Sequence, residues 1–220
     1  MQQFRFLGEN SRSYEEIWRF QKERVEAIAK GQAEEALIFC EHEEVITAGR
    51  RYREENLLQK DAKIFFIERG GDLTWHGPGQ LVIYPLLKLN GSIFQHGLSE
   101  YLRFCEDWVI DVLSGYSLEA GRFGPTGVWL RSEPEAPPRK IASIGVAVRR
   151  WVTYHGIALN VSNDLLAFEK IRPCNFDASV MTSLEKEGIH CSLEDLIESF
   201  LDSFSRLRPG TAELRRSHIA

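Results

Sequence analysis

The 220-residue sequence lacks any apolar run long enough to cross a membrane as a helix, because charged residues interrupt every hydrophobic stretch. Its first thirty residues carry charges throughout and contain no apolar signal-peptide core. These absences predict a soluble, cytoplasmic protein with no membrane contact. The net charge of −5 is modest and acidic, which argues against wholesale binding of nucleic acid.

Cysteine is scarce and is not spaced for metal or disulfide bonding. Four cysteines form no CxxC pair and no zinc-finger pattern, so reduced thiols in a cytosol are expected. Cys40 and Cys105 lie in apolar stretches and are predicted to be small core residues. Cys191 comes directly before a predicted helix, whose N-terminus would lower the pKa of the thiol. Cys174 lies in the polar loop IRPCNFDAS, where a core thiol has little to pack against, so it is a candidate nucleophile.

Three common catalytic motifs are also missing. There is no Walker A sequence, no G-x-S-x-G elbow and no HExxH pattern. Their absence argues against a P-loop nucleotide site, a serine hydrolase of that type and a zinc protease site. No cofactor and no metal is predicted.

The hydrophobic spacing predicts three amphipathic helices and a set of short strands. One helix follows Ser13, which forms a capping-box pattern with Glu16, another spans about 98–113, and the third follows Ser192 as N-cap. EALIFCEHEEVITAG indicates two short strands or a strand and a turn, and Pro85 within LVIYPLL indicates an edge strand or a bulge. The other predicted strands are KIFFIE, GVWLR, KIASIGVAV and WVTYHGIALNV. The pattern predicts an α+β fold, a single domain over residues 1–220 on one mixed β-sheet flanked by helices.

Lys140 opens the apolar strand KIASIGVAV, so its stem enters a region where burial disfavours a charge. The ordinary alternative is a strand-end lysine that reaches back to water. His76 and His155 each precede a glycine where a loop meets a strand. For each histidine alone, a hydrogen-bonded structural role is the simpler interpretation.

The stretch RGGDLTWHGPGQLVIYPLLKL, residues 69–89, places four glycines and a proline ahead of an apolar strand. Glycine lacks Cβ and tolerates positive φ, so such a loop brings backbone close to a ligand. A tight turn that merely joins two strands is the alternative.

Three blocks together resemble the lipoyl(octanoyl) transferase family. RGGDLTWHGPGQLVIYP resembles its signature, RKIASIGVAVRRWVTYHGIALNV its second block and IRPC its third, in the right order from about Arg69 to Ser183. The resemblance implies the fold of the biotin and lipoate protein ligases. It also implies octanoyl transfer from octanoyl-acyl carrier protein to lipoyl domains of 2-oxoacid dehydrogenase complexes and the glycine cleavage H protein, by a monomer.

The resemblance also implies the roles of individual residues. Cys174 would carry the acyl thioester, with Lys140 as its catalytic partner. The acyl donor site would be lined by Arg69, Gly70, Gly71, Asp72, Leu73, Thr74, Trp75, His76, Ser143, Ile144, Gly145, Gly156, Ile157 and Ala158.

Two residues depart from the family pattern. Asn175 replaces the glycine that usually follows the catalytic cysteine, and asparagine tolerates the left-handed conformation better than other non-glycine residues. Trp75 replaces a tyrosine, which keeps an aromatic wall but removes a hydroxyl. Two other functions stay open: an ATP-dependent lipoate or biotin ligase, and a catalytically silent acyl-binding relative.

An acidic carrier protein needs a basic docking surface. The densest basic cluster is Arg50, Arg51 and Arg53, and the next is Arg149 with Arg150. Ordinary solvated surface is an equally good explanation of either cluster.

Overall fold

The structure is a computed structural model of the chain, and it describes residues 1–89, 94, 97–133, 135–173, 176–208 and 215–216. The helices are α1 (Tyr14–Ala29), α2 (Leu98–Ser114) and α3 (Leu193–Leu207). The strands are β1 (Gln2–Phe6), β2 (Ala36–Cys40), β3 (Val45–Ala48), β4 (Ile64–Phe66), β5 (Leu73–His76), β6 (Gln80–Leu86), β7 (Ala120–Gly121), β8 (Gly127–Leu130), β9 (Arg139–Arg149), β10 (Val152–Asn160) and β11 (Arg215–Arg216). Short 3-10 helices occur at Gly8–Asn10, Glu54–Asn56, Leu165–Lys170 and Ala178–Val180. In these ranges no helix is long and apolar enough to cross a membrane.

The main sheet is mixed, as the sequence predicts. Its strand order is β11-β1-β2-β6-β10-β9-β8-β7, with β1 parallel to β2 and β11 and the other neighbours antiparallel. The structure adds a smaller sheet, β4-β3-β5, which the sequence analysis did not separate from the main one. The polar segment EHEE between β2 and β3 cannot continue a buried strand, so the chain leaves the main sheet there.

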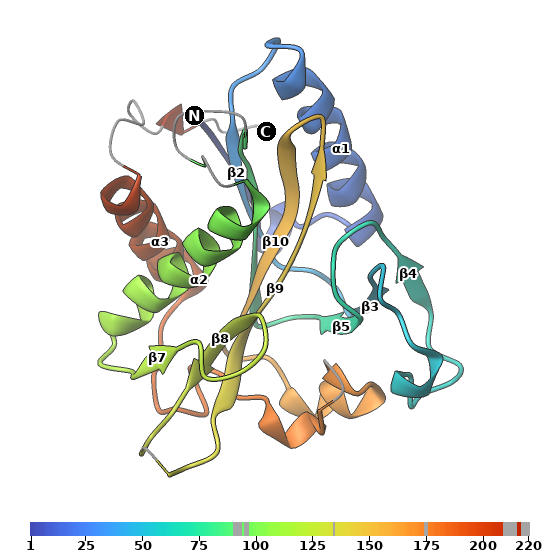
Figure 1. Ribbon diagram of the computed structural model, residues 1–220, viewed down its shortest axis with the longest axis vertical. Coiled ribbons are helices and arrows are strands. Elements are labelled where there is room, and N and C mark those ends of the chain that lie inside the picture. The colour runs from blue at the N-terminus through green and yellow to red at the C-terminus, as the bar shows by residue number, and fades with distance from the viewer. Residues whose placement is uncertain (90–93, 95–96, 134, 174–175, 209–214, 217–220) are drawn as a thin grey trace.

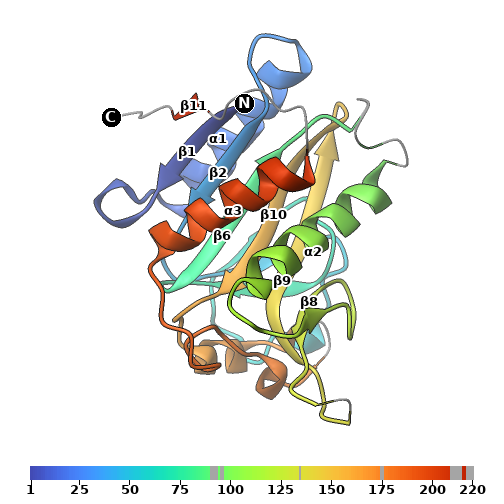
Figure 2. The same cartoon turned by 90° about the vertical axis from the view of Figure 1, so that its left-hand side faces the viewer.

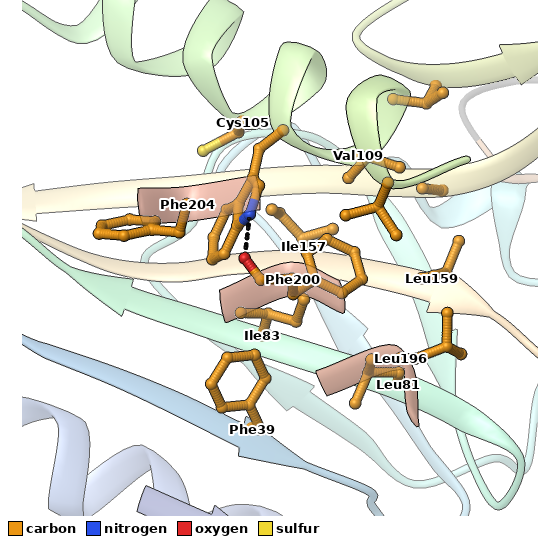
Figure 3. Close-up of a cluster of buried hydrophobic side chains, with 14 of the residues drawn as sticks. Phe39, Leu81, Ile83, Cys105, Val109, Ile157, Leu159, Leu196, Phe200 and Phe204 are labelled. Atoms are coloured by element: carbon orange, nitrogen blue, oxygen red, sulfur yellow. Dashed lines mark hydrogen bonds between the residues drawn. The ribbon is translucent and has the colours of Figure 1, made fainter. Parts of the chain in front are cut away.

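Two helical layers enclose the main sheet. Helices α2 and α3 lie side by side over one face, and α1 covers the other (Figures 1 and 2). The larger core lies beneath α2 and α3, where Phe200 and Phe204 pack among strand residues such as Ile83 (Figure 3). The indole N–H of Trp108 donates to the carbonyl of Phe200 at 2.8 Å, which joins α2 to α3.

The helix starts predicted from the sequence are confirmed. Ser13 and Glu16 form both bonds of the capping box of α1, and the Ser192 hydroxyl accepts from Asp195 N–H at the start of α3. The buried face of α1 is Tyr14, Ile17, Gln21, Val25 and Ile28, which recur at the spacing of helical turns. These caps satisfy N–H groups that would otherwise lack a partner in the first turn.

The edge position indicated by Pro85 was wrong, because β6 lies between β2 and β10 in the middle of the sheet. The regular ladder between β6 and β10 ends at the pair Ile83–Ile157. Beyond it Thr153 joins the two strands with both backbone and side chain: its N–H donates to Leu87 O at 2.9 Å, and its hydroxyl donates to Pro85 O at 2.7 Å and accepts from Leu87 N–H at 2.9 Å. Proline brings no N–H to a sheet, and here the Thr153 hydroxyl satisfies the carbonyl of Pro85 and the N–H of Leu87.

We expect Thr153→Val to lower the free energy of unfolding by about 1–3 kcal/mol, because the buried Leu87 N–H loses its acceptor. Thr153→Ser keeps the hydroxyl and is the matched control, which should stay closer to the wild type. Urea unfolding measures both variants. A valine variant as stable as the wild type would show that the hydroxyl does not support this part of the sheet.

Candidate active site

The glycine loop between β4 and β5 closes over an open edge of β9. Strand β8 pairs with β9 only as far as Gly127–Ser143, so among the described residues no strand continues along that edge. Instead, Gly70 N–H donates to Val146 O at 2.9 Å. The loop thus occupies the place of a strand, as the sequence predicted for a loop that approaches closely through its backbone.

The loop is fixed from below by the chain that follows β3. Gly49 N–H donates to Asp72 O at 3.1 Å, and Arg51 N–H to Gly71 O at 3.0 Å. Gly71 has φ +86°, and a Cβ on Gly49 would overlap Gly71 O, so both positions require glycine. The buried guanidinium of Arg69 donates to Thr47 O at 2.8 Å and to its hydroxyl at 2.9 Å. Arg69 therefore holds the loop onto β3.

Beneath the loop is a narrow slot of about 60 Å³. It is lined by Tyr14, Arg69, Gly70, Gly71, Asp72, Leu73, Thr74, His76, Val82, Tyr84, Lys140, Ser143, Ile144, Gly145, His155, Gly156, Ile157, Ala158 and Pro173. The structure thus brings together all but one of the residues that the resemblance assigned to the acyl site. Gly145 and Gly156 are cross-strand partners, so the backbone of β9 and β10 itself forms part of the wall.

Trp75 is the exception, and the aromatic wall expected from it is absent from the slot lining. Successive side chains of a strand point to opposite faces, and in β5 Leu73 and Trp75 both join the small core beneath the second sheet. There the Trp75 ring meets Phe168 edge-on, with centroids 5.4 Å apart. The Tyr-to-Trp departure therefore falls in a packing position.

Lys140 is buried at 2% exposure, so the alternative of a lysine that reaches back to water was wrong. Its Nζ donates to Thr126 O at 3.1 Å and lies 5.2 Å from the centroid of the Trp129 ring. Gly127 makes this position possible, because a Cβ there would come within 2.8 Å of Lys140 Cε. The amine is thereby held at the end of the slot nearest to Pro173 and β8.

Cys174 and Asn175 lie outside the described residues, whereas their neighbours Pro173 and Phe176 are described. Pro173 lines the same slot as Lys140. Phe176 contacts Trp129 with ring centroids 5.7 Å apart, and Trp129 is the ring beside the lysine amine. Arg172 N–H donates to Asn56 O at 2.8 Å, which ties this loop to the 3-10 helix after β3.

Sequence reasoning missed two tyrosines at the inner end of the slot, which is polar, and interpreted the histidine there as structural. Tyr14 comes from α1, Tyr84 from β6 and His155 from β10. The buried spacing of α1 predicted that Tyr14 faces inward, but nothing in the sequence indicated that it meets a slot. His155 has φ 55° within a strand, and its N–H donates to the side chain of Gln21 at 2.8 Å.

Burial keeps the groups at the inner end uncharged. It lowers the pKa of His76 to about 4, although Gln80 bonds the ring at 2.7 Å and partly opposes the shift. Burial likewise lowers the pKa of His155 and raises the pKa of Tyr14 and Tyr84. The inner end of the slot is therefore lined by uncharged rings and hydroxyl groups.

The thiols of the described residues are poor nucleophiles. Burial raises the pKa of Cys40 and of Cys105, the latter to about 12, as expected for core residues. The helix effect expected for Cys191 was wrong in direction, because burial raises the pKa of this thiol as well. In the same ranges no three His, Cys, Asp or Glu side chains are grouped to hold a metal ion.

The lowered pKa of His76 predicts acid sensitivity of the fold. A histidine in the unfolded chain binds a proton below about pH 6.5, whereas folded His76 resists protonation down to about 4. Its contribution to stability is therefore complete above pH 6.5 and is lost as the pH falls toward 4. We expect His76→Gln to flatten the fall in unfolding free energy between pH 7 and 4, measured by urea unfolding. The exposed His190→Gln is the control, and an unchanged slope in His76→Gln would contradict the prediction.

Comparisons with known proteins identify the family of the chain. The profile of the lipoyl protein ligase A/B catalytic domain family matches residues 13–205. An octanoyltransferase of Bacteroides thetaiotaomicron is 47% identical over 191 residues, covering 80% of this chain and 82% of that protein. A probable octanoyltransferase of Pyrobaculum arsenaticum is 37% identical over 211 residues, covering 92% and 94%.

Among solved structures, a bipartite lipoate protein ligase from Thermoplasma acidophilum superposes with a TM-score of 0.68 at 14% identity. The match covers 100% of this chain and 87% of that one. That likeness confirms the predicted ligase-type fold. The chain therefore belongs to the lipoyl protein ligase A/B catalytic domain family, and it is an acyltransferase.

Proposed function

We propose that this protein transfers an octanoyl group from octanoyl-acyl carrier protein to a lysine of lipoyl domains through a thioester on Cys174. The observation that carries the proposal is the slot beneath the glycine loop, which Lys140 and Pro173 line together. Relatives named octanoyltransferase, similar over most of the chain, support the acyl group. The described chain forms one structural unit, and we propose that residues 1–220 act as a single catalytic domain.

The first step exchanges one thioester for another. The Cys174 thiolate attacks the carbonyl carbon of the octanoyl thioester, the bond to the carrier sulfur breaks, and the carrier thiol takes up a proton as it leaves. The acyl chain lies in the slot, among Ile144, Ile157 and Ala158. About seven buried carbons beyond the carbonyl provide on the order of 5 kcal/mol before ordering costs, enough to select chains by length.

The second step forms the product amide. The acceptor lysine, deprotonated to the neutral amine, attacks the acyl carbon; the nitrogen gives up a second proton as the C–S bond breaks, and the Cys174 sulfur leaves as a thiolate. Because a thioester is converted to an amide, the transfer is downhill and requires no nucleotide. We propose lipoyl domains of 2-oxoacid dehydrogenase complexes and the glycine cleavage H protein as acceptors, and a monomer in the cytoplasm as the working form.

Lys140 serves proton transfer more than activation of the thiol. Lowering a thiol pKa from ~8.5 to ~6 raises the thiolate fraction at neutral pH about 30-fold, but nucleophilicity falls roughly 13-fold. The net gain of about two-fold is too small to justify a buried lysine. The amine of Lys140, fixed beside the reacting carbonyl, is suited to receive the proton from the incoming acceptor lysine.

Intact mass spectrometry tests the thioester. Incubation with octanoyl carrier protein is expected to add one octanoyl group to the wild type and none to Cys174→Ser. Cys191→Ser is the matched control and should keep the adduct, because its thiol is partly buried with a raised pKa. An adduct that survives in Cys174→Ser would contradict the assignment, and product formed from octanoate and ATP would establish a ligase instead.

Substitution of Lys140 tests the proton-transfer role. Lys140→Ala should leave the fold intact and lower kcat for octanoylation of a lipoyl domain by about 10²-fold or more. Lys140→Arg should not restore it, because a guanidinium stays protonated. Circular dichroism and thermal unfolding monitor the fold of both variants. Recovery of turnover with arginine would contradict a proton-accepting lysine.

A further inference from the structure

A second cavity lies on the α2 side of the main sheet, next to the slot. Its volume is about 430 Å³, several times that of the slot. We call it the arginine groove, and it is lined by Arg51, Arg53, Asn56, Gly70, Gly71, Asp72, Leu98, Leu102, Pro125, Thr126, Ile144, Gly145 and Val146. Its walls come from the start of α2, the chain before β8, the open edge of β9 and the chain after β3.

The groove and the slot meet at the open edge of β9. Gly70, Gly71 and Asp72 of the glycine loop line both cavities, and so do Ile144 and Gly145 of β9. The Lys140 side chain lines the slot, while its Nζ donates to the carbonyl of Thr126, which lines the groove. If a thioester lies beside Lys140 with its acyl chain in the slot, the part of the donor that carries the thiol can therefore extend into the arginine groove.

The far wall of the groove carries two guanidinium groups. Arg51 and Arg53 are exposed, and neither side chain forms an ion pair with any described residue. The second basic cluster differs, because Arg149 and Arg150 both pair with Glu26, at 2.7 and 3.1 Å. Of the two clusters that the sequence offered for carrier recognition, the first contributes Arg51 and Arg53 to the groove, whereas neither Arg149 nor Arg150 lines the groove or the slot.

The groove also contains one carboxylate, and it is already bonded. Asp72 accepts from Arg53 N–H at 3.0 Å and from the Asn56 amide at 2.5 Å. The other atom of that amide, Asn56 Oδ1, is buried and has no donor in the described chain.

The rest of the lining is apolar. Leu98 is 43% exposed and Leu102 is partly buried on the first turns of α2, opposite Val146 on β9. The groove thus combines aliphatic walls with two exposed guanidinium groups. A long, flexible arm with a phosphate at its end matches both features.

We propose that the arginine groove binds the phosphopantetheine arm of the acyl donor, with Arg51 and Arg53 on its phosphate. The inference rests on the carrier-protein donor of the proposed function. In this assignment Arg51 and Arg53 select the donor. The acyl chain of the donor occupies the slot, and its phosphopantetheine arm occupies the groove.

Small donors of increasing length test the assignment. Octanoyl-N-acetylcysteamine, octanoyl-pantetheine and octanoyl-phosphopantetheine are compared by kcat/KM for transfer to a lipoyl domain, followed by intact mass. In the wild type the phosphate should raise kcat/KM by about ten- to hundred-fold, the range of charge-assisted hydrogen bonds. In the double variant Arg51→Gln/Arg53→Gln, the ratio of kcat/KM for octanoyl-phosphopantetheine to kcat/KM for octanoyl-pantetheine should fall toward one.

Arg149→Gln/Arg150→Gln is the matched control, with two exposed arginines removed, and it should keep the wild-type ratio. Leu102→Trp, which narrows the groove without changing charge, should reduce the advantage of octanoyl-pantetheine over the N-acetylcysteamine donor. Thermal unfolding confirms that each variant is folded.

Transfer without any phosphate preference, or a preference that persists in Arg51→Gln/Arg53→Gln, overturns the groove assignment alone. Failure of every donor, the shortest included, contradicts octanoyl transfer itself and overturns the inference with it. Formation of octanoyl adenylate from octanoate and ATP, lost in Arg51→Gln/Arg53→Gln, would make the groove a nucleotide site and overturn the assignment as well.

Discussion

The hydrogen bond from Gly70 N–H to Val146 O is the contact on which the site depends. It closes the glycine loop onto an edge of β9 that β8 leaves open, and so encloses the slot. The loop reaches this edge only because Arg69 is buried on Thr47 beneath it. A single backbone bond is weak, but here several converge on one short segment and fix its position.

Much of this arrangement could be predicted from the sequence, because local patterns determine it. The caps of α1 and α3, the hairpin of β9 and β10 and the burial of Cys40 and Cys105 follow from residue types at neighbouring positions. The residues proposed for the acyl site were assigned through ordered blocks that resemble a family. The slot lining agrees with it at all but one position.

What the sequence could not provide depends on contacts between distant segments. Pro85 indicated an edge strand or a bulge, yet β6 is a central strand, in which the hydroxyl of Thr153, 68 positions away, donates to the carbonyl of Pro85. Trp75 was assigned to the acyl site because its block resembles the family signature, but its ring packs in the small core beneath the second sheet. The pKa of Cys191 rises instead of falling, since burial outweighs the nearby helix start. Each error concerns an environment that is set by the fold as a whole.

The wall formed by Ile144 and Gly145 belongs to both cavities, so the two recognition tasks of the proposed enzyme are not separable. A Cβ added at Gly145 would approach Arg69 Cδ within 3.0 Å and press on the loop anchor. Any redesign of this wall to admit a longer or bulkier acyl group would also reshape the passage on the opposite side of the strand. Engineering of chain-length preference is therefore better directed at residues such as Val82 and Tyr84, which line the slot but not the groove.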